Sequence, residues 1–179
     1  MTREATIIAR SGAPLTAEAL TERFRAIGVT QGMDLMLHMS LSAIGWVSGG
    51  AEAVLSALIE ALGPSGTLMM ATPSSQLTDP RCWCAPAVPE AWWSVIRSTL
   101  PAYSPAVTPT RGVGVGPEIF RHLPATVRSG HPACSFAAHG ARAVWLTASH
   151  NLDRPFGEGS PLAKLYAVKA FRAASRCRP

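Results

Sequence analysis

The first 163 residues contain no lysine. Their 11 arginines balance the 11 acidic residues, all of which lie between Glu4 and Glu158. The net charge of +5 therefore comes entirely from the end of the chain, where the cations are Lys164, Lys169, Arg172, Arg176 and Arg178. A surface that binds nucleic acid needs basic residues spread over one face of the fold. The charge pattern predicts a neutral domain with a basic tail and no nucleic-acid partner.

Long apolar runs and paired metal-binding cysteines are also missing. No run is long enough to cross a bilayer, and the N-terminus has no apolar core of a signal peptide. We therefore expect a cytoplasmic protein with no membrane partner. The four cysteines are Cys82, Cys84, Cys134 and Cys177. Disulfides are not expected in that compartment, and Cys82-Trp-Cys84 lacks the second pair of a zinc site, so we expect no metal.

The residues that are present indicate one α/β domain. A chain of 179 residues that is 47% hydrophobic can bury a sizeable core. Residues 15–27 have helical apolar spacing, with Thr16 as the N-cap. Residues 34–38 are typical of a buried strand, 51–62 of a helix and 66–71 of a second strand. This order predicts a βαβ unit with parallel strands.

The remaining chain is less regular. Residues 72–110 are rich in proline and serine, and we expect a long functional loop that contains one short helix at residues 90–99. Further helices are predicted at residues 116–122 and from 160 to about 166. The apolar run at residues 143–147 predicts a third short strand.

Three polar clusters follow these elements. They are His38, Ser40 and Ser42 after the first strand, Thr72, Ser74 and Ser75 after the second, and the glycine-rich run at residues 110–116. Ligands of open α/β sheets bind beyond the carboxyl ends of the strands, so the first two clusters are expected to lie together. Such loops suit a phosphate- or thioester-bearing ligand. An ordinary turn is the alternative for the glycines, whose spacing is not that of a dinucleotide site.

Asp79, Glu158, His131 and His150 are the candidate charged and acid–base residues. Glu158 lies between glycines just before a predicted helix, where a carboxylate can simply be a partner of the helix dipole. The two histidines titrate near neutral pH and lie in loops, although structural roles are the alternative for both. No Ser-His-Asp constellation follows from the spacing.

Several ordered motifs together resemble the aminoglycoside 3-N-acetyltransferase family of antibiotic N-acetyltransferases. The motifs lie at residues 38–50, 109–114, 128–132 with 135–138, and 157–162, where the last reads Gly-Glu-Gly-Ser-Pro-Leu. The resemblance spans residues 17–166 in order, and several ordered motifs are more specific than any one of them. It implies an α/β class, three-layer α/β/α fold that is incomplete at the C-terminus.

The resemblance also implies an acyltransferase that moves an acetyl group from acetyl-CoA, as co-substrate, to the 3-amino group of a 2-deoxystreptamine aminoglycoside, which confers antibiotic resistance. It implies a cofactor-binding set of His38, Ser40, Ser42, Gly45, Thr110, Arg111, Gly112 and Gly114. Asp79 and Glu158 would face the acceptor. The general base that such a reaction needs is left open between Glu158 and His150.

The resemblance ends near Tyr166, because similar proteins continue into another buried strand and a segment with His and Asn. We expect residues 1–166 to be the N-terminal part of a single acetyltransferase domain. Residues 167–179 lack apolar periodicity, and we expect a basic tail with no recognisable element, unrelated to the family, in a truncated or frameshifted product. A frayed helical end is the alternative for these residues. An inactive remnant and an α/β domain for another phosphorylated ligand are the alternatives. Monomer and homodimer both remain open.

Overall fold

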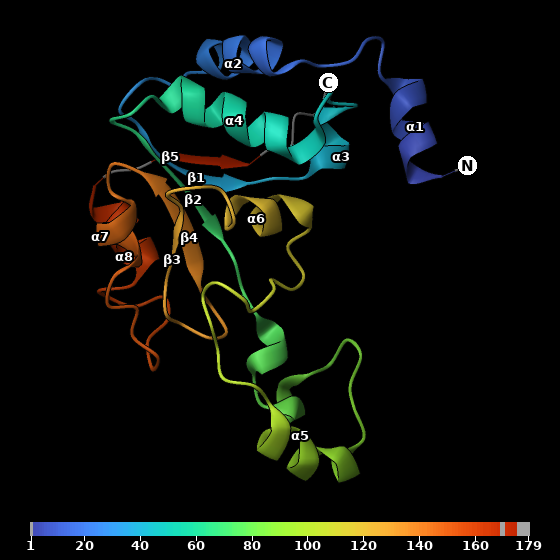
Figure 1. Ribbon diagram of the computed structural model, residues 1–179, viewed down its shortest axis with the longest axis vertical. Coiled ribbons are helices and arrows are strands. Elements are labelled where there is room, and N and C mark those ends of the chain that lie inside the picture. The colour runs from blue at the N-terminus through green and yellow to red at the C-terminus, as the bar shows by residue number, and fades with distance from the viewer. Residues whose placement is uncertain (1, 169–170, 175–179) are drawn as a thin grey trace.

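The computed structural model describes residues 2–168 and 171–174, which build a five-stranded mixed sheet in the order β3-β4-β2-β1-β5 (Figure 1). The strands are β1 (Asp34–His38), β2 (Thr67–Ala71), β3 (Val127–Arg128), β4 (Phe136–Gly140) and β5 (Phe171–Ala174). β1 runs parallel to both β2 and β5, whereas β4 is antiparallel to β2 and β3. The predicted parallel βαβ unit is confirmed.

Helices cover both faces of the sheet. The helices in the described residues are α1 (Arg3–Arg10), α2 (Ala17–Ala26), α3 (Leu41–Ile44), α4 (Gly50–Leu62), α5 (Trp93–Thr99), α6 (Val115–Phe120), α7 (Ala143–Thr147) and α8 (Pro161–Ala167). Side chains of α2, α4 and α6 share one apolar cluster with the sheet, and side chains of α7 and α8 share another. The predicted three-layer α/β/α architecture is therefore confirmed.

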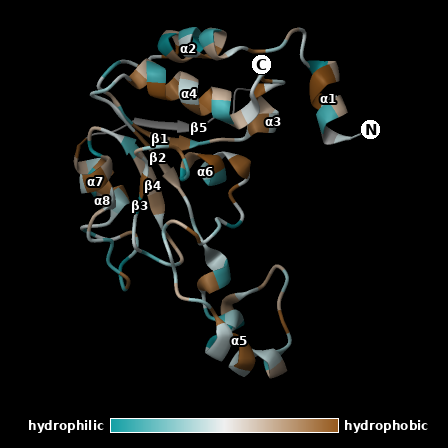
Figure 2. Cartoon of the chain, viewed as in Figure 1, coloured by the Kyte–Doolittle hydropathy of each residue, from teal (hydrophilic) through white to brown (hydrophobic). Residues whose placement is uncertain are grey.

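The strands supply both layers because their side chains alternate between the two faces. Leu35 and Leu37 of β1 enter the cluster beneath α4, whereas Met36 enters the cluster beneath α7 and α8. In β2, Leu68 enters the cluster beneath α4, and Met69 enters the cluster beneath α7 and α8. Hydrophobic and hydrophilic residues alternate around α4, as expected for a helix with one face on the sheet (Figure 2).

Two predictions about regular structure are wrong. Residues 143–147 form α7, not a strand, and the residues they bury, Ala143, Leu146 and Thr147, have helical spacing. The expectation of no regular element at residues 167–179 fails at residues 171–174, which form β5 on the edge of β1. An unpaired strand edge accepts another strand through its backbone alone, so side-chain periodicity does not reveal this pairing. Residues 169, 170 and 175–179 lie outside the described part.

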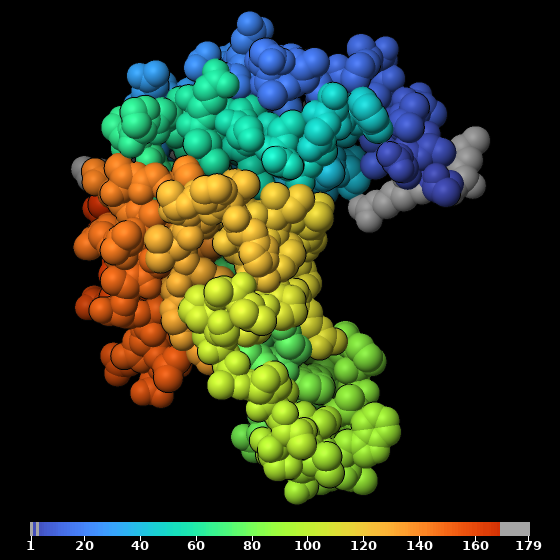
Figure 3. All heavy atoms as spheres, viewed as in Figure 1, coloured from blue at the N-terminus to red at the C-terminus, as the bar shows by residue number. Residues whose placement is uncertain are grey.

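The proline-rich segment, residues 72–110, leaves the end of β2 and projects as a separate lobe (Figure 3). Its regular pieces are the 3-10 helices η1 (Ser75–Leu77), η2 (Pro80–Cys82) and η3 (Glu90–Trp92), followed by α5. The predicted short helix at residues 90–99 is confirmed. Within the part of the chain that the structure covers, no helix has the length and apolar character needed to cross a membrane.

Candidate functional site

The carboxyl ends of β1 and β2 meet at one edge of the sheet because these strands are parallel and paired in register, Leu37 opposite Met70. His38 ends β1, and Thr72 follows β2. After His38 the chain makes the short helix α3. The hydroxyl oxygens of Ser40, which precedes the helix, and of Ser42, within it, are 3.4 Å apart. The residues of the first two predicted clusters therefore lie at a common edge.

The glycine-rich run joins this edge through backbone contacts. The Arg111 N–H donates to the Pro73 carbonyl at 2.9 Å, and the Ser74 hydroxyl donates to the Pro109 carbonyl at 3.0 Å. Gly116 packs so closely on Met39 that a Cβ there would overlap the methionine side chain. The structure thus brings all three predicted polar clusters together.

Gly112 and Gly114 leave open space in this loop. Their φ angles are +78° and +77°, in the left-handed region that glycine adopts without strain. A Cβ on either glycine would meet no atom within 4 Å, so a ligand has access to the backbone here. The Arg111 side chain is exposed beside them. A loop of this kind can receive a phosphate-bearing chain through N–H groups and one guanidinium.

Glu118 anchors the start of the glycine loop. One carboxylate oxygen accepts both the backbone N–H and the hydroxyl of Thr110 at 2.7 Å. The other accepts two bonds from Arg121, whose remaining Nη1 donates to the Ala106 carbonyl at 2.7 Å. The Arg121 guanidinium, followed by the Thr110 bonds, lowers the pKa of Glu118 from 4.5 to about 2. The carboxylate is therefore ionised at neutral pH and holds Thr110 in place.

Arg128 is buried, 7% exposed, behind the same edge. Its guanidinium donates to the Thr72 and Thr108 carbonyls and to the hydroxyls of Ser74 and Ser135. Within residues 2–168 and 171–174, no carboxylate forms an ion pair with it. Burial accordingly lowers the pKa of Arg128. Arg128 holds backbone segments together and does not neutralise an acid.

His150, a predicted acid–base residue, is 8% exposed and uses both ring nitrogens. Nε2 lies 2.8 Å from the Pro155 carbonyl, which can only accept, so Nε2 carries the proton. Burial lowers the pKa of His150, which favours the neutral ring, and Nδ1 then accepts from the Ser129 hydroxyl at 2.9 Å. His131 lies against it with ring centroids 4.8 Å apart. This geometry suits a structural residue better than a general base.

Glu158 is exposed and lines a hollow of about 580 Å³ together with Trp145 and Lys164. A neighbouring hollow of about 410 Å³ is lined by His38 and Met36. The two hollows share the side chains of Phe156, Leu162 and Tyr166. The structure therefore places the predicted acceptor residue Glu158 and the predicted cofactor residue His38 on adjoining hollows.

Asp79 lies apart from these hollows, in the proline-rich segment. Its two carboxylate oxygens accept from Nε and Nη2 of Arg97, each at 3.0 Å, and one also accepts the Arg81 N–H. These bonds, those to Arg97 first, lower the pKa of Asp79. The carboxylate is thus paired within its own lobe.

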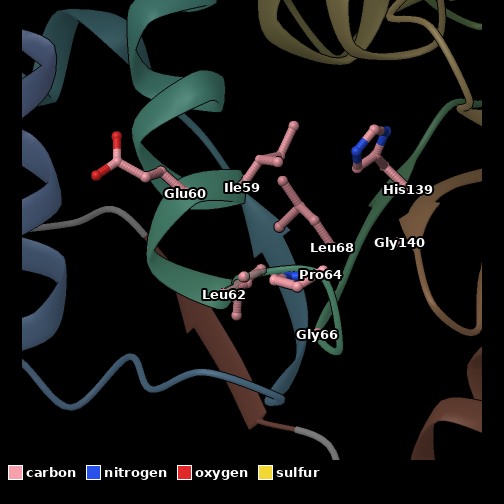
Figure 4. A pocket seen from close by; sticks show the side chains of 9 residues that line it. Ile59, Glu60, Leu62, Pro64, Gly66, Leu68, His139 and Gly140 are labelled. Carbon is pink, nitrogen blue, oxygen red and sulfur yellow. The ribbon is translucent and has the colours of Figure 1, made fainter.

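A further hollow, of about 430 Å³, lies at the opposite edge of the sheet (Figure 4). It is bounded by the end of α4 and by Gly66 and Gly140, which flank the start of β2 and the end of β4. Its lining, taken from the described residues, contains none of the predicted site residues. Among the described residues, no group of three or more His, Cys, Asp or Glu could hold a metal ion.

Sequence reasoning missed Glu118, Arg121 and Arg128 as residues that organise the site. The available signal is weak. Arg128 follows Val127 in a short strand, and Glu118 and Arg121 have the i, i+3 spacing of an ordinary helical ion pair. The importance of the two arginines arises from carbonyl acceptors 15 or more residues away, which the sequence pattern does not display. That of Glu118 arises from the N–H and hydroxyl of Thr110, which precedes the helix.

Comparison with known proteins places these features among acetyltransferases. Residues 36–171 match the profile of a family described as aminoglycoside 3-N-acetyltransferase. The SPbeta prophage-derived aminoglycoside N(3')-acetyltransferase-like protein YokD of Bacillus subtilis (strain 168) is 45% identical over 159 residues, which are 88% of this chain and 58% of YokD. Aminoglycoside N(3)-acetyltransferase VII of Streptomyces paromomycinus is 39% identical over 92% of this chain and 57% of its own. The chain thus spans less than two thirds of these relatives.

Solved structures show the same likeness. The crystal structure of YokD from Bacillus subtilis has a TM-score of 0.88 and 44% identity over 90% of this chain and 60% of YokD. The binary complex of AAC-IIIb with CoASH has a TM-score of 0.79 and 34% identity over 90% of this chain and 59% of that one. AAC-VIa bound to sisomicin has a TM-score of 0.79 and 32% identity, with coverage of 90% and 59%.

Proposed function

Because the chain belongs to the aminoglycoside 3-N-acetyltransferase family, we propose that it transfers the acetyl group of acetyl-CoA to the 3-amino group of a 2-deoxystreptamine aminoglycoside and so confers antibiotic resistance. Residues 1–166 form, in this proposal, the N-terminal part of one acetyltransferase domain. Residues 167–179, of which only 167–171 fall within the family match, are proposed to be a tail distinct from the family sequence. The protein is proposed to be a cytoplasmic monomer or homodimer.

The donor is proposed to lie along the carboxyl edge of β1 and β2. His38, Ser40, Ser42 and Gly45 would border its pantetheine arm, and Thr110, Arg111, Gly112 and Gly114 its phosphates. The open backbone at the two glycines and the exposed guanidinium of Arg111 support this placement. AAC-IIIb, a relative of the same fold, has been solved with CoASH.

The acceptor is proposed to lie beside Glu158, whose exposed carboxylate attracts a polycation. Relatives of this fold have been solved with the aminoglycosides sisomicin and gentamicin. Asp79 is a second proposed contact, although its bonds to Arg97 must open before it can serve an ammonium group. Of these two acidic residues, Glu158 is therefore the better supported as a contact of the acceptor.

The reaction needs a base because a protonated amine has no lone pair for attack. The base removes one proton from the ammonium group, the amine nitrogen forms a bond to the thioester carbon, and the carbon–sulfur bond breaks. The nitrogen then gives up a second proton, the sulfur takes one and leaves as a free thiol, and the new amide carries no charge. We assign the base to Glu158 rather than His150, because both nitrogens of His150 are occupied by hydrogen bonds.

The convergence of the three polar clusters at one sheet edge carries this proposal. Release of free thiol from acetyl-CoA in the presence of sisomicin tests it directly. We expect turnover by the chain and a marked loss in Arg111→Ala, whereas Arg25→Ala, whose exposed side chain pairs with Glu60 of α4, serves as the matched control. Protection of the fold by CoA without turnover would favour the inactive remnant. A response to another nucleotide but not to CoA would favour a domain for a different phosphorylated ligand.

A further inference from the structure

We propose that residues 128–131, Arg-Ser-Gly-His and called the RSGH segment below, position the two substrate loops relative to each other. Arg128 holds the loop proposed for the donor, and Ser129 and His131 hold the loop that leads to Glu158. The identity of the two ligands rests on the proposed function. The mechanical role does not, because it follows from contacts within the chain.

The Arg128 side chain joins the two ends of the proline-rich segment. Nη2 lies 2.7 Å from both the Thr72 carbonyl and the Ser74 hydroxyl, where the segment leaves β2. Nη1 lies 2.5 Å from the Thr108 carbonyl, where the segment returns. The Tyr103 ring lies against the guanidinium, 5.3 Å from its centroid to the Arg128 Cζ. A planar guanidinium reaches acceptors in these separate directions at once, whereas a lysine ammonium does not.

The position of residues 105–110, where the proline-rich segment returns, fixes the donor loop. Thr108 is only two residues from Thr110, and Glu118 holds Thr110 by its N–H and hydroxyl. Arg121 adds a bond to the Ala106 carbonyl at 2.7 Å. Two buried arginines therefore hold residues 105–110. The position of these residues determines where the glycines that follow lie.

The other end of the RSGH segment fastens the acceptor loop. His131 Nδ1 accepts the backbone N–H groups of Ala133 and Cys134, so its proton is on Nε2, which donates to the Leu152 carbonyl at 3.3 Å. Ser129 donates to His150 Nδ1, and His150 Nε2 donates to the Pro155 carbonyl. Two ring donors thus hold residues 152–155.

Glu158 follows three residues after Pro155, so the position of this loop determines where its carboxylate lies. The four RSGH residues connect both loops to one another through a single short stretch of backbone. Because β3 and β4 are paired in the sheet at Arg128 and Ala137, this stretch is itself fixed to the core. A change at one end of the segment should therefore loosen one loop and leave the other in place.

Backbone hydrogen exchange on the intact chain tests this separation without any ligand. Arg128→Gln is expected to speed exchange in residues 105–114 about tenfold, the size expected from losing one or two hydrogen bonds, with no change in residues 151–158. His131→Phe should give the reverse pattern. If Arg128→Gln does not fold, Arg128→Lys, which keeps the charge, replaces it. We expect Arg128→Lys to increase the exchange rate of the same residues by a smaller factor. Arg142→Gln is the matched control, because Arg142 bonds Asp34 at the far edge of the sheet.

Ligand affinity separates the two loops, because a general loss of stability would weaken the binding of both ligands. Arg128→Gln should weaken CoA binding with sisomicin binding unchanged, and His131→Phe should do the opposite. Equal acceleration of both loops in either variant, or no acceleration in the loop that the residue contacts, overturns the proposal. If the unmodified chain binds neither ligand, the proposed function fails while the exchange pattern still decides the role of the RSGH segment.

Discussion

In the unit formed by β1, α4 and β2, paired backbones and buried apolar side chains hold the chain. Leu68 and Met69 are fully buried, and β1 pairs with β2 along four consecutive residues. In the adjoining proline-rich segment, residues 72–110, no described strand pairs with the backbone, and arginines hold it instead. Arg97 binds Asp79 inside the lobe, and Arg128 binds the carbonyls at its ends.

The difference shows how a fold can carry an irregular loop at a precise place. Proline removes backbone donors, so a segment rich in proline leaves carbonyl groups without a strand or helix to bond them. A guanidinium supplies up to five N–H donors and satisfies several carbonyls at once. The regular unit is therefore expected to unfold as a whole. The conformation of the irregular segment, in contrast, depends on a few side chains.

The largest expected effect comes from the regular unit. Leu68→Ala should lower the free energy of unfolding by about 4 kcal/mol, in the upper part of the range for buried leucines, because Leu68 is fully enclosed. Denaturant titration measures this loss. Hydrogen exchange should accelerate throughout the sheet. Acceleration confined to β2 would contradict the view that the unit unfolds together.

Glu118→Gln should have the next largest effect. Glu118 is one-third exposed and Arg121 is buried, so we expect a loss of about 2 kcal/mol, between the values of surface and buried ion pairs. The folded pKa of about 2 lies below the ordinary 4.5, so the unfolded chain binds this proton first. Stability from Glu118 is full above pH 4.5 and is lost between pH 4.5 and about 2.

Denaturant titrations across that pH range measure the Glu118 contribution. The unmodified chain should lose more stability than Glu118→Gln as the pH falls, and the two should converge near pH 2. Parallel curves would contradict the role assigned to the ionised carboxylate.

His150 should produce a smaller, pH-dependent effect. Burial is the main cause of its lowered pKa, and the charge of Lys164 adds to it. Since the folded pKa is below the ordinary 6.5, the unfolded chain binds the proton first, and stability falls as the pH drops below 6.5. His150→Gln should remove this part of the pH dependence in thermal unfolding. An unchanged slope in the variant would show that other groups cause it.

Asp79→Asn should have the smallest effect on stability, because its partners Arg81 and Arg97 are exposed. The consequence should be local: hydrogen exchange should become faster in η2 and α5, and its rate should not change in β1 or β2. Arg25→Gln, which breaks the exposed pair with Glu60 on α2 and α4, is the matched control. A large cooperative loss in Asp79→Asn would erase the distinction between the two regions.

Sequence patterns predicted the regular unit well and the irregular parts poorly. Residues 34–38 form the predicted strand, and Thr16 caps α2 through the Ala19 N–H as expected. Residues 143–147 were misread because β-branched and aromatic residues favour strands, although Val144 and Trp145 here face solvent on a helix. The role of Arg128 escaped prediction because the carbonyls that it binds, those of Thr72 and Thr108, lie 20 or more residues away. Contacts between residues so far apart in the sequence produce no periodic pattern of residue types.

Hydrogen exchange with and without CoA tests most directly whether the carboxyl edge of β1 and β2 receives the donor. We expect slower exchange in residues 38–45 and 110–114 when CoA is added, with exchange unchanged in residues 59–66 at the hollow of Figure 4. Protection at residues 59–66 instead, or no protection anywhere at saturating CoA, would contradict it.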